Sequence, residues 1–325
     1  MAAIAVYLCG GYFQSCNALY DDLDPCPQGV RLRFVYTYNM EFANAFPSQV
    51  DCLTLLVYDE NGVFVDSFTE TSDVLSDENW RMTIDLAPGK YRFQAWGGLA
   101  DENASFHFSS QPDTTPMQNL QVAIDADCMT SPTGTRLHPL FYGDLEMEVP
   151  TQSTNYVEGT VEMMKDTNNL RILLQNLSGE PADGDDFVFT ITDDNTLLGY
   201  DNLPIAGNQY TYYPWTTGQE SAGLLDNGKE ALLAFAELST SRLMAGANAT
   251  LLIQRKEDMH TVAQIPLINF LLLLKSQEFS NMGAQEFLDR ESRWNMVFFL
   301  DQSGAWISTY IKINDWIVRI NNAEL

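Results

Sequence analysis

The chain has 325 residues, enough for two domains of ordinary size, and 45% of them are hydrophobic, as in globular rather than disordered proteins. Its 44 acidic and 17 basic residues give a net charge of −27, and a surface of that sign repels nucleic acid. We therefore expect no nucleic-acid partner. The acidic residues lie in small dispersed clusters without the spacing of a calcium loop, so they predict a solvated surface and no metal site.

The first residues resemble an export signal. Residues 1–13 are almost all apolar or small, and Gln14 and Ser15 then lead to Cys16. A short apolar run that ends in a small residue before Cys resembles a bacterial lipoprotein signal, although no basic residue precedes the run. We expect residues 1–15 to be a signal peptide, Cys16 to carry the lipid, and the acidic residues 16–29 to be a tether. The alternative is that Cys16 is an ordinary structural cysteine.

Three cysteines remain if Cys9 leaves with the signal peptide and Cys16 is lipidated, namely Cys26, Cys52 and Cys128. An exported protein meets an oxidising environment, so one disulfide and one free thiol are allowed. The sequence leaves the pairing open. None of the three has the CxxC spacing of a zinc site.

Residues 30–150 predict an N-terminal β-sandwich, because short alternating segments are separated by turn signals. Asn61-Gly62 predicts a tight hairpin turn, and Ala87-Pro88-Gly89 predicts a second reversal. The polar residues 100–118 are expected to form a long loop. The predicted strands cover residues 32–38, 52–58, 63–68, 80–86, 90–96 and 140–149.

Residues 151–325 predict a C-terminal β-sandwich, which begins after the polar, proline-led stretch 150–155. The apolar run 265–274 is too short to span a membrane and is expected to be a buried strand or a short core helix. Residues 283–290 predict one short helix. The predicted strands cover residues 156–164, 170–177, 187–192, 231–238, 249–255, 296–300, 306–313 and 316–320.

The last two of these strands flank Asn314-Asp315 and predict a terminal hairpin. Each has an apolar face, which must be buried either in its own sandwich or in a groove of a neighbouring subunit. We expect the first outcome and keep strand donation as the alternative. The candidate partner-strand residues are Trp306, Ile311, Ile313, Trp316, Val318 and Ile320.

No catalytic motif emerges from the sequence. His107, His138 and His260 lie far apart, without metal-ligand spacing, and the chain has no GxSxG nucleophile elbow. We expect no enzyme, no catalytic residue and no cofactor. The aromatic run from Tyr210 to Trp215 is expected to pack in a core or between domains, with a sugar-binding platform as the alternative.

Five blocks of the sequence resemble one known family. CNALYDDLDPCPQGVRLRFVYTYNMEFANAFPSQVDCLTLLVYDENGVFV is similar to the opening of Bacteroidales fimbrial anchor subunits of the FimB type, and APGKYRFQAWGG is similar to their next shared block. LFYGDLEMEV and VEMMKDTNNLRILLQNL resemble the join into their second domain. IKINDWIVRINNAEL resembles their C-terminus. The likeness is collinear from Cys16 to Leu325, and YNMEFANAF and MKDTNN are its most specific parts.

This resemblance implies two tandem transthyretin-like β-sandwiches and a lipid on Cys16. It also implies attachment to the outer membrane, a place at the base of a surface fimbria, and other fimbrial subunits as partners. Related stalk subunits polymerise by strand exchange. Two alternatives stay open, which are a stalk or tip subunit and a surface glycan-binding lipoprotein.

Overall fold

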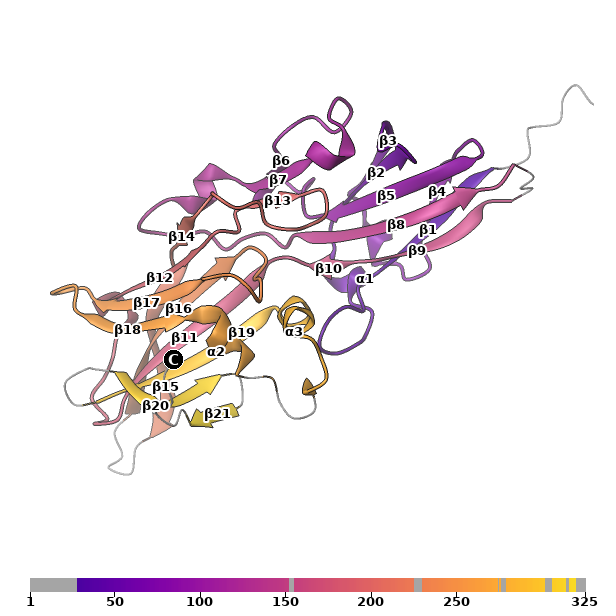
Figure 1. Cartoon of the computed structure of the whole chain (residues 1–325). Helices are drawn as coiled ribbons and strands as arrows, with labels where there is room; N and C mark the ends of the chain where they lie inside the picture. Colours follow the sequence, from indigo (N-terminus) through magenta and orange to yellow (C-terminus); the bar gives the residue numbers. More distant parts are fainter. Residues whose placement is uncertain are drawn as a thin grey trace, which may run out of the picture.

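The computed structural model describes residues 28–151, 155–224, 230–273, 275, 279–301, 306–313 and 316–319, with only the backbone for Leu224 and for the last two segments. The chain is mostly β-sheet, as predicted. Figure 1 shows an elongated molecule with one β lobe at each end. The described residues form five sheets, two in each lobe and one between them.

The first lobe is a sandwich of a three-stranded and a five-stranded sheet. The three-stranded sheet has the order β4-β1-β9, in which β1 pairs antiparallel with β4 and parallel with β9. Its strands are β1 Gly29–Val35, β4 Met82–Asp85 and β9 Val157–Glu162. The five-stranded sheet, β10-β8-β5-β2-β3, comprises β10 Met164–Lys165, β8 Phe141–Val149, β5 Gly89–Gly97, β2 Leu53–Asp59 and β3 Phe64–Glu70.

Period-two alternation explains the core of this lobe. Val30, Leu32 and Phe34 point inward from β1 and are buried. Phe34 stacks against Phe46, which begins the short helix α1 (Phe46–Gln49), with ring centroids 6.0 Å apart. The predicted hairpin at Asn61-Gly62 is confirmed, with Gly62 at a φ of 75°. The turn at residues 87–89 is a different kind of reversal, because β4 and β5 belong to different sheets.

The second lobe is a sandwich of a six-stranded and a four-stranded sheet. The six-stranded sheet, β15-β16-β11-β19-β20-β21, comprises β15 Thr216–Leu224, β16 Glu230–Thr240, β11 Asn168–Asn176, β19 Arg293–Leu300, β20 Trp306–Ile313 and β21 Trp316–Arg319. The four-stranded sheet, β14-β12-β17-β18, comprises β14 Tyr210–Tyr212, β12 Phe187–Asp193, β17 Thr250–Arg255 and β18 Thr261–Pro266.

Two helices accompany the second lobe. Pro266 ends β18, and α2 (Leu267–Leu272) follows it with four buried apolar side chains, so the run 265–274 contains a short core helix. The predicted helix near residues 283–290 is confirmed as α3 (Ala284–Arg290). No helix among the described residues is long and apolar enough to cross a membrane.

A fifth sheet joins the lobes, and the sequence did not predict it. It has the order β13-β7-β6, with β6 Phe106–Phe108, β7 Gln121–Ile124 and β13 Leu197–Gly199. Because β13 comes from the second half of the chain and the other two strands from the first, both halves share this sheet. One core continues from the outer face of the five-stranded sheet, at Leu56 and Trp96, through to the second lobe. The stretch 100–118 is therefore not a simple loop, because it contains β6.

The sheets do not separate at the boundary predicted for residues 150–155. β9 and β10 follow that stretch, yet β9 pairs with β1 and β10 pairs with β8. The first lobe therefore extends to Lys165. After this polar, proline-led stretch, the chain pairs with β1 on the side opposite β4.

Candidate functional site

Only two of the cysteines considered lie among the described residues. Cys52 is buried just before β2, and Cys128 is half-buried in the turn after β7. Both are free thiols, so they are not bonded to each other. Burial raises the pKa of each thiol. Cys16, with the rest of the predicted signal and tether up to residue 27, and Cys26 lie outside the described residues, so the lipid and any pairing with Cys26 stay predictions.

The C-terminal hairpin is confirmed as β20 and β21, which pair antiparallel. β20 also pairs with β19, so the hairpin forms one edge of the six-stranded sheet. This backbone pairing agrees with the expected intramolecular placement. The side chains of the candidate partner-strand residues and all of Ile320 lie outside the described part of the chain, and strand donation stays a prediction.

The aromatic run 210–215 does not form a flat exposed platform. Tyr212 is buried and donates from its hydroxyl to Asn195 Oδ1 at 2.6 Å. Tyr210 meets the Tyr212 ring edge-on, at an interplanar angle of 80°. Trp215 is half-buried with the guanidinium of Arg136 over its ring, 5.5 Å from the centroid. These contacts are those of packing side chains, as expected.

Two of the three histidines contact aspartate carboxylates. His107 Nδ1 contacts Asp125, and His138 Nε2 lies 3.1 Å from a carboxylate oxygen of Asp51. Asp101 also approaches His138, and the three ligand atoms of Asp51, Asp101 and His138 lie within 4.8 Å of one another. The His138–Asp51 contact accounts for this arrangement without a metal, and Asp51 is exposed.

A buried ion pair fixes α3 to the second lobe beside the joint between the lobes. Arg242, which follows β16, donates from Nε and Nη2 to the two carboxylate oxygens of Asp289 on α3, each at 2.9 Å. Both side chains are at least nine-tenths buried. Such fork-to-fork geometry is the strongest form of an ion pair, because two parallel hydrogen bonds carry the charge interaction. The neighbouring Arg290 lies over the rings of Tyr38 and Phe42, 4.1 Å and 4.8 Å from their centroids, and so attaches α3 to the first lobe.

Further polar contacts cross the same joint. The backbone oxygen of Tyr200 accepts from Gln94 Nε2 at 2.8 Å and from the Tyr142 hydroxyl at 3.0 Å. Asp166 is fully buried and accepts from Asn202 Nδ2 at 2.8 Å. Burial raises the pKa of the Asp166 carboxyl to about 7, although the Arg242 charge acts in the opposite direction. These contacts fix the two lobes against each other.

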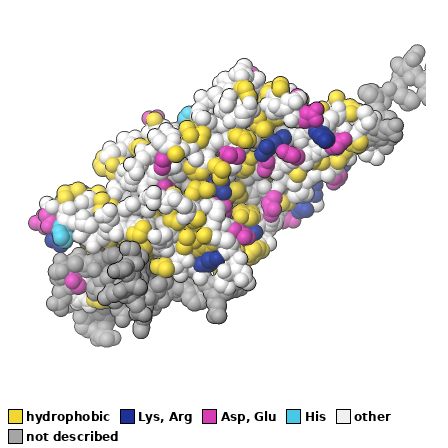
Figure 2. Space-filling view, viewed as in Figure 1, with side chains coloured by type: hydrophobic (Ala, Val, Ile, Leu, Met, Phe, Trp, Pro, Cys, Tyr) yellow, Lys and Arg dark blue, Asp and Glu magenta, His cyan; other side chains and the backbone are white. Residues whose placement is uncertain are grey.

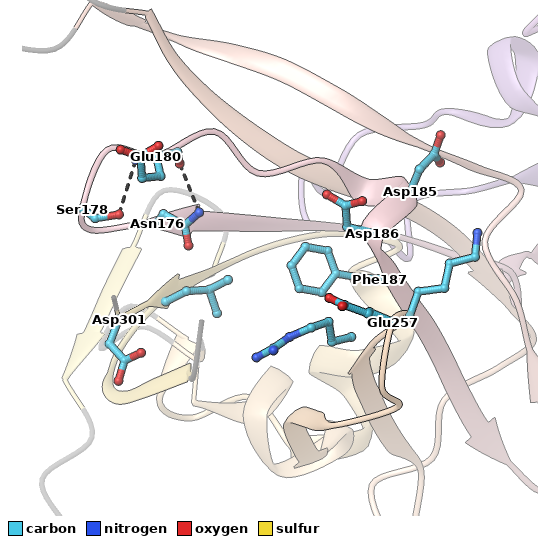
Figure 3. Close-up of a pocket in the computed structure, with 11 residues that line it drawn as sticks. Asn176, Ser178, Glu180, Asp185, Asp186, Phe187, Glu257 and Asp301 are labelled. Atoms are coloured by element: carbon cyan, nitrogen blue, oxygen red, sulfur yellow. Dashed lines mark hydrogen bonds between the residues drawn. The ribbon is translucent and has the colours of Figure 1, made fainter. Parts of the chain in front are cut away.

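A cavity of about 640 Å³ lies at the end of the second lobe, where β11 and β19 end and β12 begins. Figure 3 shows carboxylates on opposite sides of it, with Glu180 and Asp301 facing Asp186 and Glu257. Arg255 and Lys256 also line it. Histidine, cysteine and paired nucleophile-base groups are absent from its described lining, so the cavity offers a polar acidic surface rather than recognisable catalytic chemistry.

A second cavity, of about 630 Å³, lies between the two lobes, and we call it the basic cleft. Four cationic side chains line it, and Glu237 is the one carboxylate among its described lining. Amide side chains from both lobes complete the wall. The cations are Arg136, Lys165, Arg171 and Arg293, and the amides are Gln49, Asn103, Asn169 and Asn295.

Lys165 is the most buried cation of the basic cleft and is only 7% exposed. Its Nζ donates to Gln49 Oε1 at 3.2 Å and lies 5.7 Å from the centroid of the Phe141 ring. Burial, reinforced by the charges of Arg293 and Arg136, lowers the pKa of Lys165 to about 8. Sequence reasoning missed this site because its cations and amides come from five separate segments of the chain. The one signal in the sequence was the charge of Lys165 within the MKDTNN block.

The rest of the surface differs from this cleft. Figure 2 shows a face on which the few Lys and Arg side chains lie mostly beside Asp and Glu. Arg92 is an example, since its Nη2 lies 2.7 Å from Asp144 and its Nη1 lies 3.8 Å from Glu146. In the basic cleft, among the described residues, only Arg171 of the four cations forms an ion pair.

Comparison with known proteins assigns the fold to a family. Residues 23–322 match the model of the fimbrillin-A associated anchor proteins Mfa1 and Mfa2. A crystal structure of a candidate adhesin from Bacteroides thetaiotaomicron is 53% identical, superposes with a TM-score of 0.87, and aligns over 92% of this chain and 100% of its own. A second protein of that organism, crystallised as a candidate polysaccharide-binding protein, is 29% identical, with a TM-score of 0.77 over 90% of this chain and 98% of its own.

A curated relative extends the match across the whole length. The minor fimbrium anchoring subunit Mfa2 of Porphyromonas gingivalis is 21% identical over 321 residues, which are 98% of this chain and 94% of the relative. The family model covers nearly all of both lobes and the joint between them. The chain therefore belongs to the family of fimbrillin-A associated anchor proteins.

Proposed function

We propose that this protein is the lipid-anchored base subunit of a surface fimbria and attaches it to the outer membrane. The observation that carries the proposal is the match to the anchor-protein family over residues 23–322, which spans both lobes. The sequence before β1 supports it. An apolar run ends at Cys16, and a stretch of about a dozen residues that contains three aspartates and two prolines follows. A lipid on Cys16 would hold the first lobe near the membrane on that tether.

The rigid joint suits an anchoring role. A base subunit must transmit pulling forces between the membrane and the fimbria, and a loosely linked pair of domains would extend under load. The shared sheet β13-β7-β6, the Arg242–Asp289 ion pair and the Arg290 contacts oppose that extension. Partner subunits would attach at the second lobe, where the C-terminal hairpin forms a sheet edge.

Replacement of Cys16 by Ala tests the anchor directly. We expect the Cys16→Ala protein to leave the membrane fraction and fimbriae to be shed into the medium, because a covalent lipid contributes about 0.8 kcal/mol per buried CH₂. Cys26→Ala is the matched control and should stay in the membrane. Mass spectrometry of the N-terminal peptide checks for the lipid. An unmodified Cys16, or membrane partition that does not change in Cys16→Ala, would refute the lipid anchor.

Two other roles make different predictions. A stalk or tip subunit would be found along or at the far end of the fimbria, whereas immunogold labelling of a base subunit marks only the cell-proximal end. A glycan-binding lipoprotein is favoured only by the 29%-identical relative described as a candidate polysaccharide-binding protein. The buried Tyr212 and the covered ring of Trp215 leave no flat aromatic platform in the 210–215 run for stacking on sugars.

A further inference from the structure

We propose that the basic cleft between the lobes binds the carboxylate side chains of an acidic polypeptide segment, with Lys165, Arg136 and Arg293 as the binding cations. The binding itself does not depend on the anchor role. If the protein is the base subunit, as proposed above, the segment would belong to another fimbrial subunit.

The first argument is the distribution of charge. The chain has 17 basic residues against 44 acidic ones, yet four cations line one cavity with a single carboxylate. That carboxylate, Glu237, already pairs with Arg171, which also contacts Glu220. Among the described residues, Lys165, Arg136 and Arg293 have no carboxylate oxygen within 4.0 Å. In a protein this acidic, three cations without an ion pair around one cavity favour a negative ligand, and in the described part of the chain the only carboxylate charge seen to act on any of them is that of Glu291 on Arg293.

The second argument is the burial of Lys165. A buried ammonium group without a counter-ion is costly, because its solvation by water is lost and no opposite charge replaces it. The carboxylates nearest in sequence and space have other partners. Asp166 accepts from Asn202 in the joint, and Glu291 accepts from the backbone N–H groups of residues 292 and 293. The groups that contact Lys165, Gln49 and the ring of Phe141, are neutral, and the charges that act on it, those of Arg293 and Arg136, are positive. A ligand carboxylate would supply the missing charge.

The third argument concerns the class of ligand. Four amide side chains accompany the cations, and amides pair with the N–H and C=O groups of a peptide backbone. A sugar ligand would need an accessible aromatic face, but the two tryptophans of the cleft do not offer one. Trp294 is buried and donates to Asn168, and Arg136 covers the ring of Trp215. Arg136 and Arg293 are exposed, so a segment can enter the cleft from solvent.

Binding can be measured with the full-length protein and a fluorescein-labelled hexaglutamate peptide at low ionic strength. We expect saturable binding that weakens as salt is added, since the interaction is between charges. Inorganic phosphate and trigalacturonate are added separately as competitors and should compete weakly. The proposal is overturned if hexaglutamate does not bind, if phosphate competes as well as the peptide, or if trigalacturonate binds more tightly.

Three variants place the binding in the cleft. Lys165→Met, Arg136→Gln and Arg293→Gln should each weaken hexaglutamate binding about tenfold or more, the usual effect of losing a charge-assisted hydrogen bond. Lys90→Met removes an exposed cation that lines another cavity, and it should bind like the parent. Arg136 and Arg293 are exposed, so their variants report on binding even if Lys165→Met folds poorly. Equal affinity of Arg136→Gln, Arg293→Gln and Lys90→Met would overturn the proposal.

Discussion

Arg242 and Lys165 are both buried cations between the two lobes, yet their surroundings are opposite. Arg242 is 8% exposed and has a carboxylate, Asp289, bound to it in a fork. Lys165 is 7% exposed and has an amide oxygen and an aromatic ring instead. A buried ion pair stabilises the fold, because removing one partner leaves the other charge buried without water or a counter-ion to stabilise it. An unpaired buried charge serves no such purpose, and its presence calls for a ligand.

The largest effect on the free energy of unfolding should follow from breaking the Arg242–Asp289 pair. We expect Asp289→Ala to lower the free energy of unfolding by about 3–5 kcal/mol, because it leaves the Arg242 guanidinium buried without its carboxylate. Urea unfolding followed by tryptophan fluorescence measures the loss. Glu158→Ala is the matched control. It removes the exposed Arg31–Glu158 pair, 3.8 Å long, and should change stability by no more than about 0.5 kcal/mol. Similar losses in both variants would contradict a structural role for the buried pair.

The contrast between the two cations also shows where sequence reasoning reaches its limit. The alternation in β1 and β11 predicted buried faces, and the turn at Asn61-Gly62 predicted a hairpin, because both signals lie within a few neighbouring residues. The joint could not be predicted in that way. Strands β6 and β13 are only three residues long, too short for alternation to show, and β8 to β12 separate β7 from its partner β13 in the sequence.

The burial of some polar residues could not be predicted from the sequence either. In the MKDTNN block, Lys165, Asp166 and Asn168 are all buried, although a run of polar residues is ordinarily a solvated turn. Their burial depends on partners far along the chain, such as Asn202 for Asp166 and Trp294 for Asn168. The family resemblance singled out this block without explaining it. The structure supplies the reason, since these residues connect the two lobes.

The pH dependence of the free energy of unfolding should distinguish the buried carboxylates from the buried lysine. Burial raises the pKa of Asp166 from its ordinary value of 3.8 to about 7, so the folded protein holds a proton between these pH values that the unfolded chain has lost. This group's contribution therefore favours the folded state at low pH and is lost as pH rises from about 4 to 7. Asp166→Asn should remove that decline, measured as the difference between parent and variant unfolding curves.

A second carboxylate provides the matched comparison. Burial raises the pKa of Asp193 to about 6, so Asp193→Asn should remove a decline that ends about one pH unit lower. The Asp166→Asn difference should keep changing up to pH 7, whereas the Asp193→Asn difference should become constant near pH 6. If the two difference curves coincide, the assignment of the higher pKa to Asp166 is wrong.

The pH effect expected for the unpaired lysine has the opposite sign. Burial and the neighbouring arginines lower the pKa of Lys165 from 10.5 to about 8, so between these values the unfolded chain holds a proton that the folded protein has released. The free energy of unfolding of the parent should therefore rise with pH from about 8 to 10 relative to Lys165→Met. Tyr36 and Tyr58, whose pKa values burial raises to about 12, act against this rise near pH 10, but they are present in both proteins and cancel in the difference.

At pH 7 Lys165→Met should be as stable as the parent or slightly more stable, because it removes an uncompensated buried charge. Adding hexaglutamate should reduce the slope, since a bound carboxylate stabilises the charged lysine and raises its pKa. Parallel curves for parent and variant from pH 8 to 10 would show that Lys165 remains charged in the folded protein, and that an opposite charge already lies beside it.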